Sequence, residues 1–434
     1  MPHAPRPPRP EQPGTLAAAC TEVFRAAVGR LSAARRVAEA LREDPLPGGV
    51  VRVLALGKAA APMLDAAAAA LGARLRDALC VHPEGTPGPR CPGARALAAG
   101  HPRPTEGSLR AGQAIRDWAV AGRGAPALVL LSGGGSALSL APAGVSAAEK
   151  VGAVAALMAA GLPIHALNAV RKHLSELKGG QLGALLAPAP VRVLALSDVP
   201  GDDLSVIASG PLAPDPTTFA DALAAAGHAD TALPVAVQAR LEAGARGELP
   251  ETIKPGDPRL AGVVHCVLAG PQDLARAAAD EAARHGFSAE ADPAPLSGEV
   301  EVVASRLAAW ARQHAGRGRR LLALGGEPTI RLPPAAPRPD GGRAQHLALL
   351  TALALEGLPA AALAAGSDGR DGPTEQAGAV VDGDTAARAR RLGLALPAAL
   401  AEARSGPAAV ALGAAIPRFD SGTHVCDLVL VAVE

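Results

Sequence analysis

Short runs of apolar residues recur along this chain, separated by longer stretches in which apolar side chains follow helical spacing. In one such stretch, Val300, Val303, Leu307 and Trp310 recur three and four positions apart, which places them on one face of a helix. The short runs lie at 51–56, 127–131, 191–196, 263–268, 321–324 and 360–364. Strands that are apolar nearly throughout and alternate with helices predict a parallel sheet covered on both faces, and therefore an α/β fold.

Polar segments divide this pattern. A chain of 434 residues suits two domains better than one, and a polar stretch rich in glycine and proline at 242–259 marks the expected boundary. Residues 1–13 are rich in proline and lack an apolar stretch that leads to a cleavage site, so they predict a disordered leader and not a signal peptide. Ser146 and Glu149 predict a capping box at the start of an apolar helix.

Composition narrows the classes of protein. Aromatic residues make up only 1% of the chain, so the cores must be filled by Ala, Val and Leu. The net charge of +1, without a basic block, argues against a nucleic-acid partner. Two long uncharged stretches, 124–148 and 151–170, are interrupted by glycine and proline and predict buried elements, not membrane spans. Five scattered cysteines indicate reduced thiols in a cytoplasmic protein, and an oligomer is compatible with all of these features.

The turns after the predicted strands carry the candidate chemistry, because open parallel sheets bind ligands beyond the carboxyl ends of their strands. Lys58 follows the first apolar run. Lysine is scarce in this chain, which mostly uses arginine, so a lysine at a strand end suggests a need for a compact point charge. The alternative is a solvated lysine at the start of a helix.

A glycine-rich loop follows the apolar run at 127–131. It consists of Ser132, Gly133, Gly134, Gly135 and Ser136. Three glycines allow backbone N–H groups to approach a phosphate, and the start of the next helix would add a positive dipole end. The loop is neither a Walker A motif nor a dinucleotide-binding G-x-G-x-x-G turn, and a plain flexible turn remains the alternative.

The segment 168–180 combines the only asparagine of the chain, Asn168, with three cations, Arg171, Lys172 and Lys178. An anion-binding surface and a solvated helix face account for this spacing equally well.

An acidic turn follows the run at 191–196 and contains Asp198, Asp202 and Asp203. Carboxylates grouped in this way suit a hard cation such as Mg²⁺, which bridges phosphates. Aspartates in turns also bond to their own backbone. Asp198 lies nearest to the end of the strand and is the better candidate for a metal ligand.

Three further turns lie in the second half of the chain. Glu327 follows one apolar run, Arg343 precedes a helix, and Asp368 follows another run. A guanidinium can grip a substrate carboxylate with two parallel hydrogen bonds. Either carboxylate could orient a hydroxyl group or accept its proton.

In this order, the motifs resemble the type-2 glycerate kinases, whose C-terminal part is the MOFRL domain. The matching pieces are VLALGKAAAPM, AGHPRPTEGS, LSGGGSAL, LNAVRKHLSELKGGQL, ALSDVPGDDLSVIASGP, LGGEPT, GGRAQHLAL and AAGSDGRDGPTEQAGAVVD. The resemblance implies a Rossmann-like parallel-sheet domain over 14–245 and a smaller α/β domain over 246–434, with the active-site cleft between them.

The resemblance also implies a reaction. Family members transfer the γ-phosphoryl group of ATP, with Mg²⁺, to the 2-hydroxyl of D-glycerate. By motif, Lys58 and Arg343 would be the cationic pair at the substrate and the transferred phosphoryl group, and Glu327 and Asp368 the carboxylates beside them. The loop 132–136, Lys178 and Asp198 would lie on the nucleotide side, with Asp198 as the metal ligand.

Four departures from the family pattern leave other functions open. GGRNQE is replaced by GGRAQH, which contains Ala344 and His346, and GPTGTNV is replaced by FDSGTHV, which contains His424. Ser367 and Thr105 are the other two changes. One alternative is an NAD(P)H-dependent hydroxypyruvate reductase, although the chain lacks a dinucleotide fingerprint. The other is a non-catalytic nucleotide-binding relative.

Overall fold

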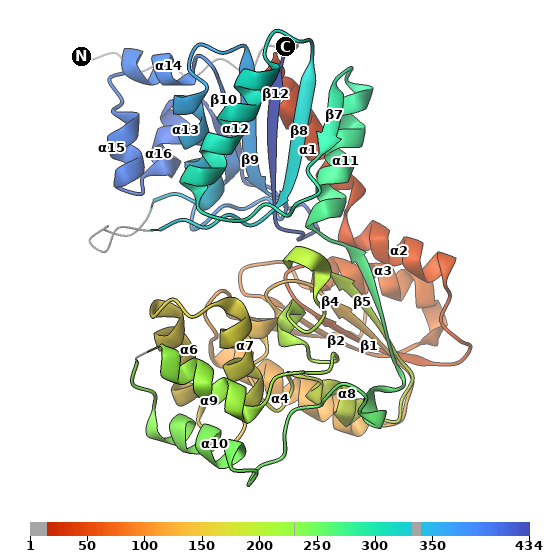
Figure 1. Cartoon of the computed structure of the whole chain (residues 1–434). Helices are drawn as coiled ribbons and strands as arrows, with labels where there is room; N and C mark the ends of the chain where they lie inside the picture. The colour runs from red at the N-terminus through yellow and green to blue at the C-terminus, as the bar shows by residue number, and fades with distance from the viewer. Residues whose placement is uncertain (1–14, 230, 332–339) are drawn as a thin grey trace, which may run out of the picture. The chain divides into compact units, whose positions relative to one another are not determined.

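A computed structural model describes residues 15–229, 231–331 and 340–434. It forms two compact units (Figure 1). We call residues 33–268 the central unit, and 269–434 together with the N-terminal segment up to Ser32 the split unit. The predicted leader, 1–13, lies outside the described residues.

The central unit contains a six-stranded sheet with the order β3-β2-β1-β4-β5-β6. Its strands are β1 (Val51–Leu56), β2 (Leu75–Pro83), β3 (Arg95–Ala99), β4 (Ala127–Leu131), β5 (Val191–Leu196) and β6 (Val263–Ala269). The pairs β1–β2, β2–β3, β1–β4 and β4–β5 are all parallel, as the apolar runs predicted. The strand order reverses between β1 and β4, and ligands bind at such switch points in doubly wound sheets.

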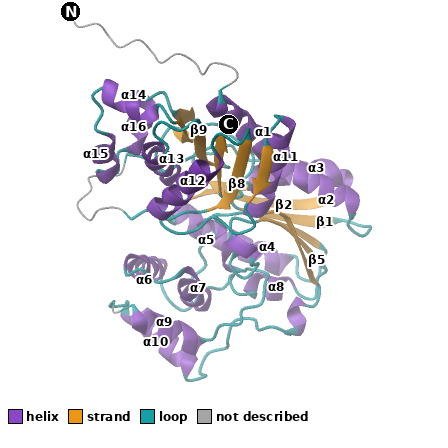
Figure 2. Ribbon diagram, turned by 45° about the horizontal axis from the view of Figure 1, so that its top comes forward, coloured by secondary structure: helices purple, strands orange, loops and turns teal. Residues whose placement is uncertain are grey.

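Helices cover both faces of this sheet: α2 and α3 lie on one side and α4 and α8 on the other (Figures 1 and 2). The helices of the unit are α2 (Ala33–Glu43), α3 (Ala60–Leu71), α4 (Glu106–Ala121), α5 (Gly135–Leu138), α6 (Ala147–Ala159), α7 (Ile164–His173), α8 (Gln181–Leu186), α9 (Phe219–His228) and α10 (Val235–Ala245). Helices α6, α7, α9 and α10 share a separate small core around Phe219. The predicted capping box is confirmed, since Ser146 Oγ accepts a hydrogen bond from Glu149 N at 3.2 Å and Glu149 Oε2 accepts one from Ser146 N at 2.8 Å.

The split unit contains a mixed sheet with the order β11-β10-β9-β12-β8-β7. Its strands are β7 (Ser288–Ala291), β8 (Arg320–Gly326), β9 (Ala360–Gly366), β10 (Gln376–Asp382), β11 (Ala415–Pro417) and β12 (Asp427–Val433). β12 runs antiparallel between β8 and β9, so that its first residue, Asp427, lies opposite both Gly326 and Gly366. The unit fits the expected second α/β domain, but its sheet is not parallel throughout, because the antiparallel strand β12 lies between β8 and β9.

Helices α12 and α13 cover one face of the mixed sheet, and α1 and α11 the other (Figures 1 and 2). The helices of the unit are α1 (Leu16–Arg30), α11 (Pro271–Arg284), α12 (Val300–His314), α13 (Arg343–Ala354), α14 (Thr385–Arg391), α15 (Leu396–Ala401) and α16 (Ser405–Ala411). The predicted helical face at 300–310 is confirmed, because Val300, Val303 and Leu307 are buried in α12. The main core cluster of the unit consists of buried Leu, Val and Ala side chains, as the scarcity of aromatic residues required.

The two units divide the chain differently from the predicted domains. Helix α1, which was assigned to the first domain at 14–245, packs on the sheet of the split unit through buried side chains that include Val23 and Phe24. Residues 246–268, which were assigned to the second domain, include most of β6, and β6 completes the sheet of the central unit. The polar segment at 242–259 is thus the end of α10 and a loop within one unit. None of the helices in the described ranges has the length and apolar character needed to span a bilayer.

Candidate functional site

In the central unit, the turns after β1 and β4 contact each other. Lys58 N donates a hydrogen bond to the Gly133 carbonyl at 2.9 Å, and Ala59 N donates one to Ser132 Oγ at 3.0 Å. Gly57 has a φ of +134°, and a Cβ there would lie 2.2 Å from Ser132 Oγ. Only glycine permits this close approach. The two neighbouring strand ends therefore bring Lys58 and the loop 132–136 together, as the sequence predicted.

The helix that follows the loop is shorter than expected. Helix α5 has only 4 residues, Gly135–Leu138. Such a helix aligns few peptide dipoles, so the predicted contribution of a helix dipole to phosphate binding is not supported. The loop itself has an unusual backbone, since Gly134 has a φ of +86° and a Cβ there would lie 2.9 Å from the His101 ring and 3.2 Å from Lys58 Cγ.

Lys178 and Ser209 contact the last residue of the same loop. Lys178 Nζ donates a hydrogen bond to the Ser136 carbonyl at 2.8 Å, and the hydroxyl oxygens of Ser136 and Ser209 lie 2.7 Å apart. Lys178 is only 3% exposed. Burial, together with the nearby charge of Arg171, lowers the pKa of Lys178 to about 7.

Sequence reasoning did not identify Ser209, although the structure gives it an unusual backbone. Ala208 and Ser209 have φ angles of +52° and +61° and are buried. Such residues cost about 1–3 kcal/mol each and concentrate at functional sites. The Ser209 carbonyl accepts a hydrogen bond from Gly179 N at 3.2 Å, and the Gly210 carbonyl accepts one from Gly180 N at 2.8 Å. These contacts hold the Ser209 hydroxyl at the loop 132–136.

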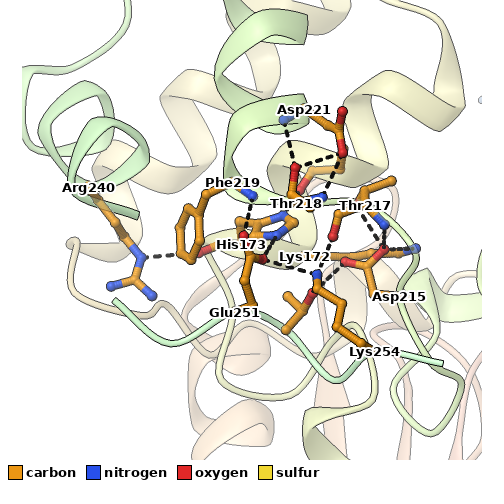
Figure 3. A network of polar contacts seen from close by, with 12 residues as sticks. Lys172, His173, Asp215, Thr217, Thr218, Phe219, Asp221, Arg240, Glu251 and Lys254 are labelled. Carbon is orange, nitrogen blue, oxygen red and sulfur yellow. Dashed lines mark hydrogen bonds and ion pairs between the residues drawn. The ribbon is translucent and has the colours of Figure 1, made fainter. Parts of the chain in front are cut away.

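The three cations predicted at 171–178 have different surroundings. Lys172 is buried in an ion pair, with its Nζ 3.2 Å from Asp215 Oδ1 (Figure 3). Asp215 also accepts hydrogen bonds from Thr217 Oγ1 at 2.7 Å and from Thr252 Oγ1 at 2.9 Å. Lys172 therefore belongs to a structural network, whereas Lys178 contacts the glycine-rich loop.

The same network joins α7 to the segment after α10. Glu251 accepts hydrogen bonds from Phe219 N at 2.9 Å and pairs with Lys254 at 3.0 Å, while His173 Nε2 lies 2.9 Å from Glu251 Oε2 (Figure 3). Arg240 lies over the Phe219 ring and donates a hydrogen bond to the His173 carbonyl at 3.0 Å. These contacts fix the position of α7, which carries Arg171 and the neighbouring Asn168.

Asp198 is half-buried in the turn after β5. In this turn, Asp203 Oδ1 accepts a hydrogen bond from Ser205 N at 2.8 Å, so Asp203 bonds to the backbone of its own turn. Asp202 has a φ of +56°, and its Oδ1 is buried without a hydrogen-bond partner in the described structure. Nowhere in the described ranges are three or more His, Cys, Asp or Glu side chains grouped for metal binding. A Mg²⁺ ion needs only one or two carboxylates when substrate phosphates complete its shell, and carboxylates of this turn fit that role.

In the split unit, Arg343 is the first residue of α13, and two carboxylates hold its guanidinium. Nε donates to Asp427 Oδ2 at 2.7 Å, Nη2 donates to Asp427 Oδ1 at 3.4 Å, and Nη1 donates to Glu327. Burial opposes the charge of Arg343, but Asp427 and Glu327 outweigh this effect, so the pKa of the guanidinium is raised. The structure thus brings Glu327 and Arg343 together and adds Asp427, which the sequence did not predict.

Asp371 positions the helix that carries Arg343. Its two carboxylate oxygens accept hydrogen bonds from Ala344 N at 3.1 Å and Gln345 N at 2.7 Å, so it caps the first turn of α13. A Cβ on Gly342 would lie 2.1 Å from Asp371 Cγ, which explains the glycine there. Burial, followed by the charge of Asp427, raises the pKa of Asp371 to about 7. The motif SDGRDG contained this residue, but its second aspartate was not chosen as a candidate.

Asp368 lies in the turn after β9. Its Oδ1 accepts a hydrogen bond from Arg370 N at 3.1 Å, and its Oδ2 lies 3.5 Å from His424 Nδ1. Ser367 Oγ accepts a hydrogen bond from Val425 N at 2.9 Å, which holds the His424 segment beside this turn. The ends of β8 and β9 and the start of β12 therefore collect Glu327, Asp368, His424 and Asp427 at one edge of the sheet.

Comparisons with known proteins agree with the motifs. The model of a domain of unknown function (DUF4147) matches residues 19–242, and the model of the MOFRL family matches residues 320–427. The chain is 35% identical over 395 residues to a glycerate 2-kinase from Pyrococcus horikoshii, covering 89% of this chain and 88% of that protein. It is 38% identical over 341 residues to a putative hydroxypyruvate reductase from Agrobacterium vitis, covering 76% of each.

A solved structure is similar over nearly the whole chain. The crystal structure of a glycerate kinase from Thermotoga maritima superposes with a TM-score of 0.85 at 32% sequence identity, covering 96% of this chain and 99% of that one. Both domain models, the relatives and the shared fold lead to one assignment. The chain belongs to the type-2 glycerate kinase family, in which a DUF4147 domain is combined with a MOFRL domain.

Proposed function

We propose that this protein is an ATP-dependent glycerate 2-kinase, which transfers a phosphoryl group to the 2-hydroxyl of D-glycerate. The observation that carries the proposal is a cluster of desolvated cations beside the glycine-rich loop of the central unit. Names of relatives support the substrate, and the contacts below support the division of tasks among the residues.

The cation cluster consists of Lys150, Arg171, Lys178 and Arg240. None of the four forms an ion pair with a carboxylate within the described residues. Burial is the main cause that lowers the pKa of each, and Lys178, Arg240 and Arg171 all add to the lowering at Lys150. Lys150 and Lys178 are buried, Arg171 and Arg240 are half-buried, and buried cations without counter-ions are costly, so this region favours an anion. A triphosphate supplies the required charge.

Residues of the split unit are suited to binding glycerate, the phosphoryl acceptor. The Arg343 guanidinium has five N–H donors, and its contacts with Asp427 and Glu327 leave at least one of them for a substrate carboxylate or a phosphoryl oxygen. Asp368 would accept the proton of the attacking hydroxyl group, with His424 beside it. Lys58 would stabilise the charge that develops on the transferred phosphoryl group.

Magnesium would bind to Asp198 and the neighbouring Asp202 in the turn after β5. When bound, it would neutralise negative charge on the nucleotide phosphates. The residues of the chain would still have to orient the acceptor hydroxyl and remove its proton. The expectation that Lys58 and Arg343 serve a single cleft stays a prediction.

A reductase is the second candidate, because a relative from Agrobacterium vitis carries that name. The turn after β1, where a dinucleotide fingerprint belongs, reads Gly57-Lys58-Ala59 and offers one glycine. This turn favours the kinase.

A substrate panel distinguishes the two functions. The protein is incubated with ATP, Mg²⁺ and one of several hydroxy acids, ADP release is measured, and the product is identified by ³¹P NMR. We expect ADP and 2-phosphoglycerate in equal amounts. Oxidation of NADH by hydroxypyruvate, without phosphorylated glycerate, would establish the reductase instead.

A further inference from the structure

Asn168 is the only asparagine of the chain and lies in α7, where Ser209 links it to Ser136 of the loop 132–136. Its side chain is almost fully enclosed, with the residue 3% exposed. Asn168 Oδ1 accepts hydrogen bonds from Arg171 Nη1 at 3.3 Å and from Ser209 Oγ at 3.4 Å. Two donors therefore converge on one oxygen.

These contacts fix which way the amide faces. A guanidinium donates hydrogen bonds and cannot accept them, so the oxygen, and not the nitrogen, of Asn168 must face Arg171. The amide nitrogen then points away from both partners. No described residue accepts a hydrogen bond from this nitrogen, and it is not among the fully enclosed polar atoms that lack a partner in the described structure. The nitrogen therefore keeps some accessible surface, and its N–H donors are available to a ligand.

Groups that could bind an anion lie close to the Asn168 amide. Ser209 Oγ, which holds Asn168, lies 2.7 Å from Ser136 Oγ, and Lys178 Nζ contacts the Ser136 carbonyl at 2.8 Å. The backbone at Ser209 is in the left-handed region, with a φ of +61°. The local structure therefore maintains an unfavourable conformation that keeps Ser209 between the loop and Asn168.

We infer that the Asn168 amide donates a hydrogen bond to a phosphate oxygen of the nucleotide at the loop 132–136. The inference rests on the proposed function, because it takes a nucleotide as the ligand. Asn168 then has two separate tasks: its oxygen positions Arg171 and Ser209, and its nitrogen binds the ligand. A purely structural asparagine would need the oxygen alone.

The variant Asn168→Asp separates these tasks. Aspartate has the same shape and keeps the acceptor oxygen for Arg171 and Ser209, but it replaces the two donors with an anionic oxygen. A hydrogen bond to a charged group is worth a factor of about 10 to 150 in affinity, and like-charge repulsion adds to the loss. We therefore expect Kd for ADP and KM for ATP to rise at least about tenfold, while KM for glycerate changes less than about twofold.

The experiment measures binding of ADP and of inorganic pyrophosphate by calorimetry, together with both KM values, kcat and Tm. The exposed Gln113→Glu variant adds the same charge in α4 and should behave like the wild type. If Asn168→Asp lowers Tm strongly, Asn168→Ser removes the amide without adding charge, and its affinity for pyrophosphate gives the answer.

Three outcomes overturn the inference: wild-type affinity in Asn168→Asp, a rise in the glycerate KM instead of the ATP KM, or a loss of ADP binding with pyrophosphate binding intact. The last outcome would place Asn168 at the base or ribose. Failure of the wild type to bind ADP or to phosphorylate glycerate would instead contradict the proposed function itself, so the two failures are distinguishable.

Discussion

The glycine-loop region of the central unit and the Arg343 region of the split unit solve opposite electrostatic problems. In the first, the buried Lys150 and Lys178 and the half-buried Arg171 have no carboxylate partner in the described structure, and desolvation lowers their pKa values. In the second, Asp427 and Glu327 hold one guanidinium and raise its pKa. The first region needs an anionic ligand to compensate its charge, whereas the second is already compensated and holds its cation rigidly.

The two regions show that functional cations differ in whether the protein itself supplies their counter-ions. A cation that lacks a counter-ion indicates where a ligand supplies charge on binding. A cation held by two carboxylates indicates a group that must keep one orientation throughout the reaction.

Lys58→Ala removes a compact charge at the junction of the two turns in the central unit. We expect kcat to fall by about a hundredfold or more, because Lys58 would lose its role in stabilising charge on the transferred phosphoryl group. Steady-state kinetics with ATP and D-glycerate measure the effect. Lys58→Arg, which keeps the charge but not its shape, should recover only part of the rate. An unchanged kcat in Lys58→Ala would remove this residue from the mechanism.

Asp427→Asn weakens the stronger of the two anchors of Arg343 and leaves Glu327 in place. We expect kcat to fall about tenfold to a hundredfold, because a guanidinium with one charged partner no longer keeps its orientation. ADP binding should be unchanged, since that ligand is assigned to the central unit. Asp420→Asn, at an exposed position in the preceding loop, is the matched control. Equal activity in both variants would show that the anchor is dispensable.

The affinity for ADP should depend on pH through Lys178. The pKa of this residue is lowered to about 7, so its cation is present below that pH and is lost as the pH rises past it. Raising the pH from about 6 to about 8 should therefore weaken ADP binding by up to about tenfold. Calorimetry in buffers with different ionisation enthalpies should also detect proton uptake on binding. Lys178→Arg should flatten the pH dependence; a wild-type profile in that variant would contradict the assignment.

Asp215→Asn should have the smallest effect on activity and the largest on stability. The Lys172–Asp215 pair lies in the structural network, and in the described structure neither side chain bonds to the loop 132–136, so we expect kcat to change less than about threefold. The free energy of unfolding should fall by about 3 kcal/mol, because a buried lysine would lose its counter-ion. Denaturant unfolding measures this change.

The pH dependence of stability gives a second check on Asp215. Burial raises the pKa of this carboxyl, but Lys172 and the bonds from Thr217 and Thr252 outweigh it and lower the pKa below 3.8. Its contribution is therefore present above about pH 4 and is lost as the pH falls further. The Asp215→Asn variant should lack this acid-dependent contribution to the free energy of unfolding. A stable variant with a slow reaction would show that Asp215 acts in catalysis and not in packing.

Sequence patterns predicted most of the strands that are buried nearly throughout, although the fully buried β12 was not among the predicted runs and the half-exposed β6 was. β1, β4, β5, β8 and β9 are apolar on both faces and appear as continuous runs. The short, half-exposed strands β3 and β7 carry no such run and were not predicted. The partners of α1 and of β6 could not be predicted either, because both contacts join segments that are distant in sequence.

In the candidate site too, the residues that tertiary packing brings together could not be predicted from the sequence. Lys58, the loop 132–136 and Glu327 were predicted because they follow strands, and ligands bind at the carboxyl ends of parallel strands. Asp427 precedes its strand, and only the antiparallel direction of β12 brings it to the same edge of the sheet. Ser209 depends on a left-handed backbone that no residue type in the segment indicates. Directions of strands and backbone conformations of this kind are set by tertiary packing.

A titration with ADP, without glycerate, tests the contrast between the two regions most directly. The account predicts that Lys178→Met weakens ADP binding by at least about tenfold, because a buried charge partner of the phosphates is lost, and that Asp427→Asn leaves it unchanged. Undiminished binding in Lys178→Met, or an equal loss in Asp427→Asn, would contradict it.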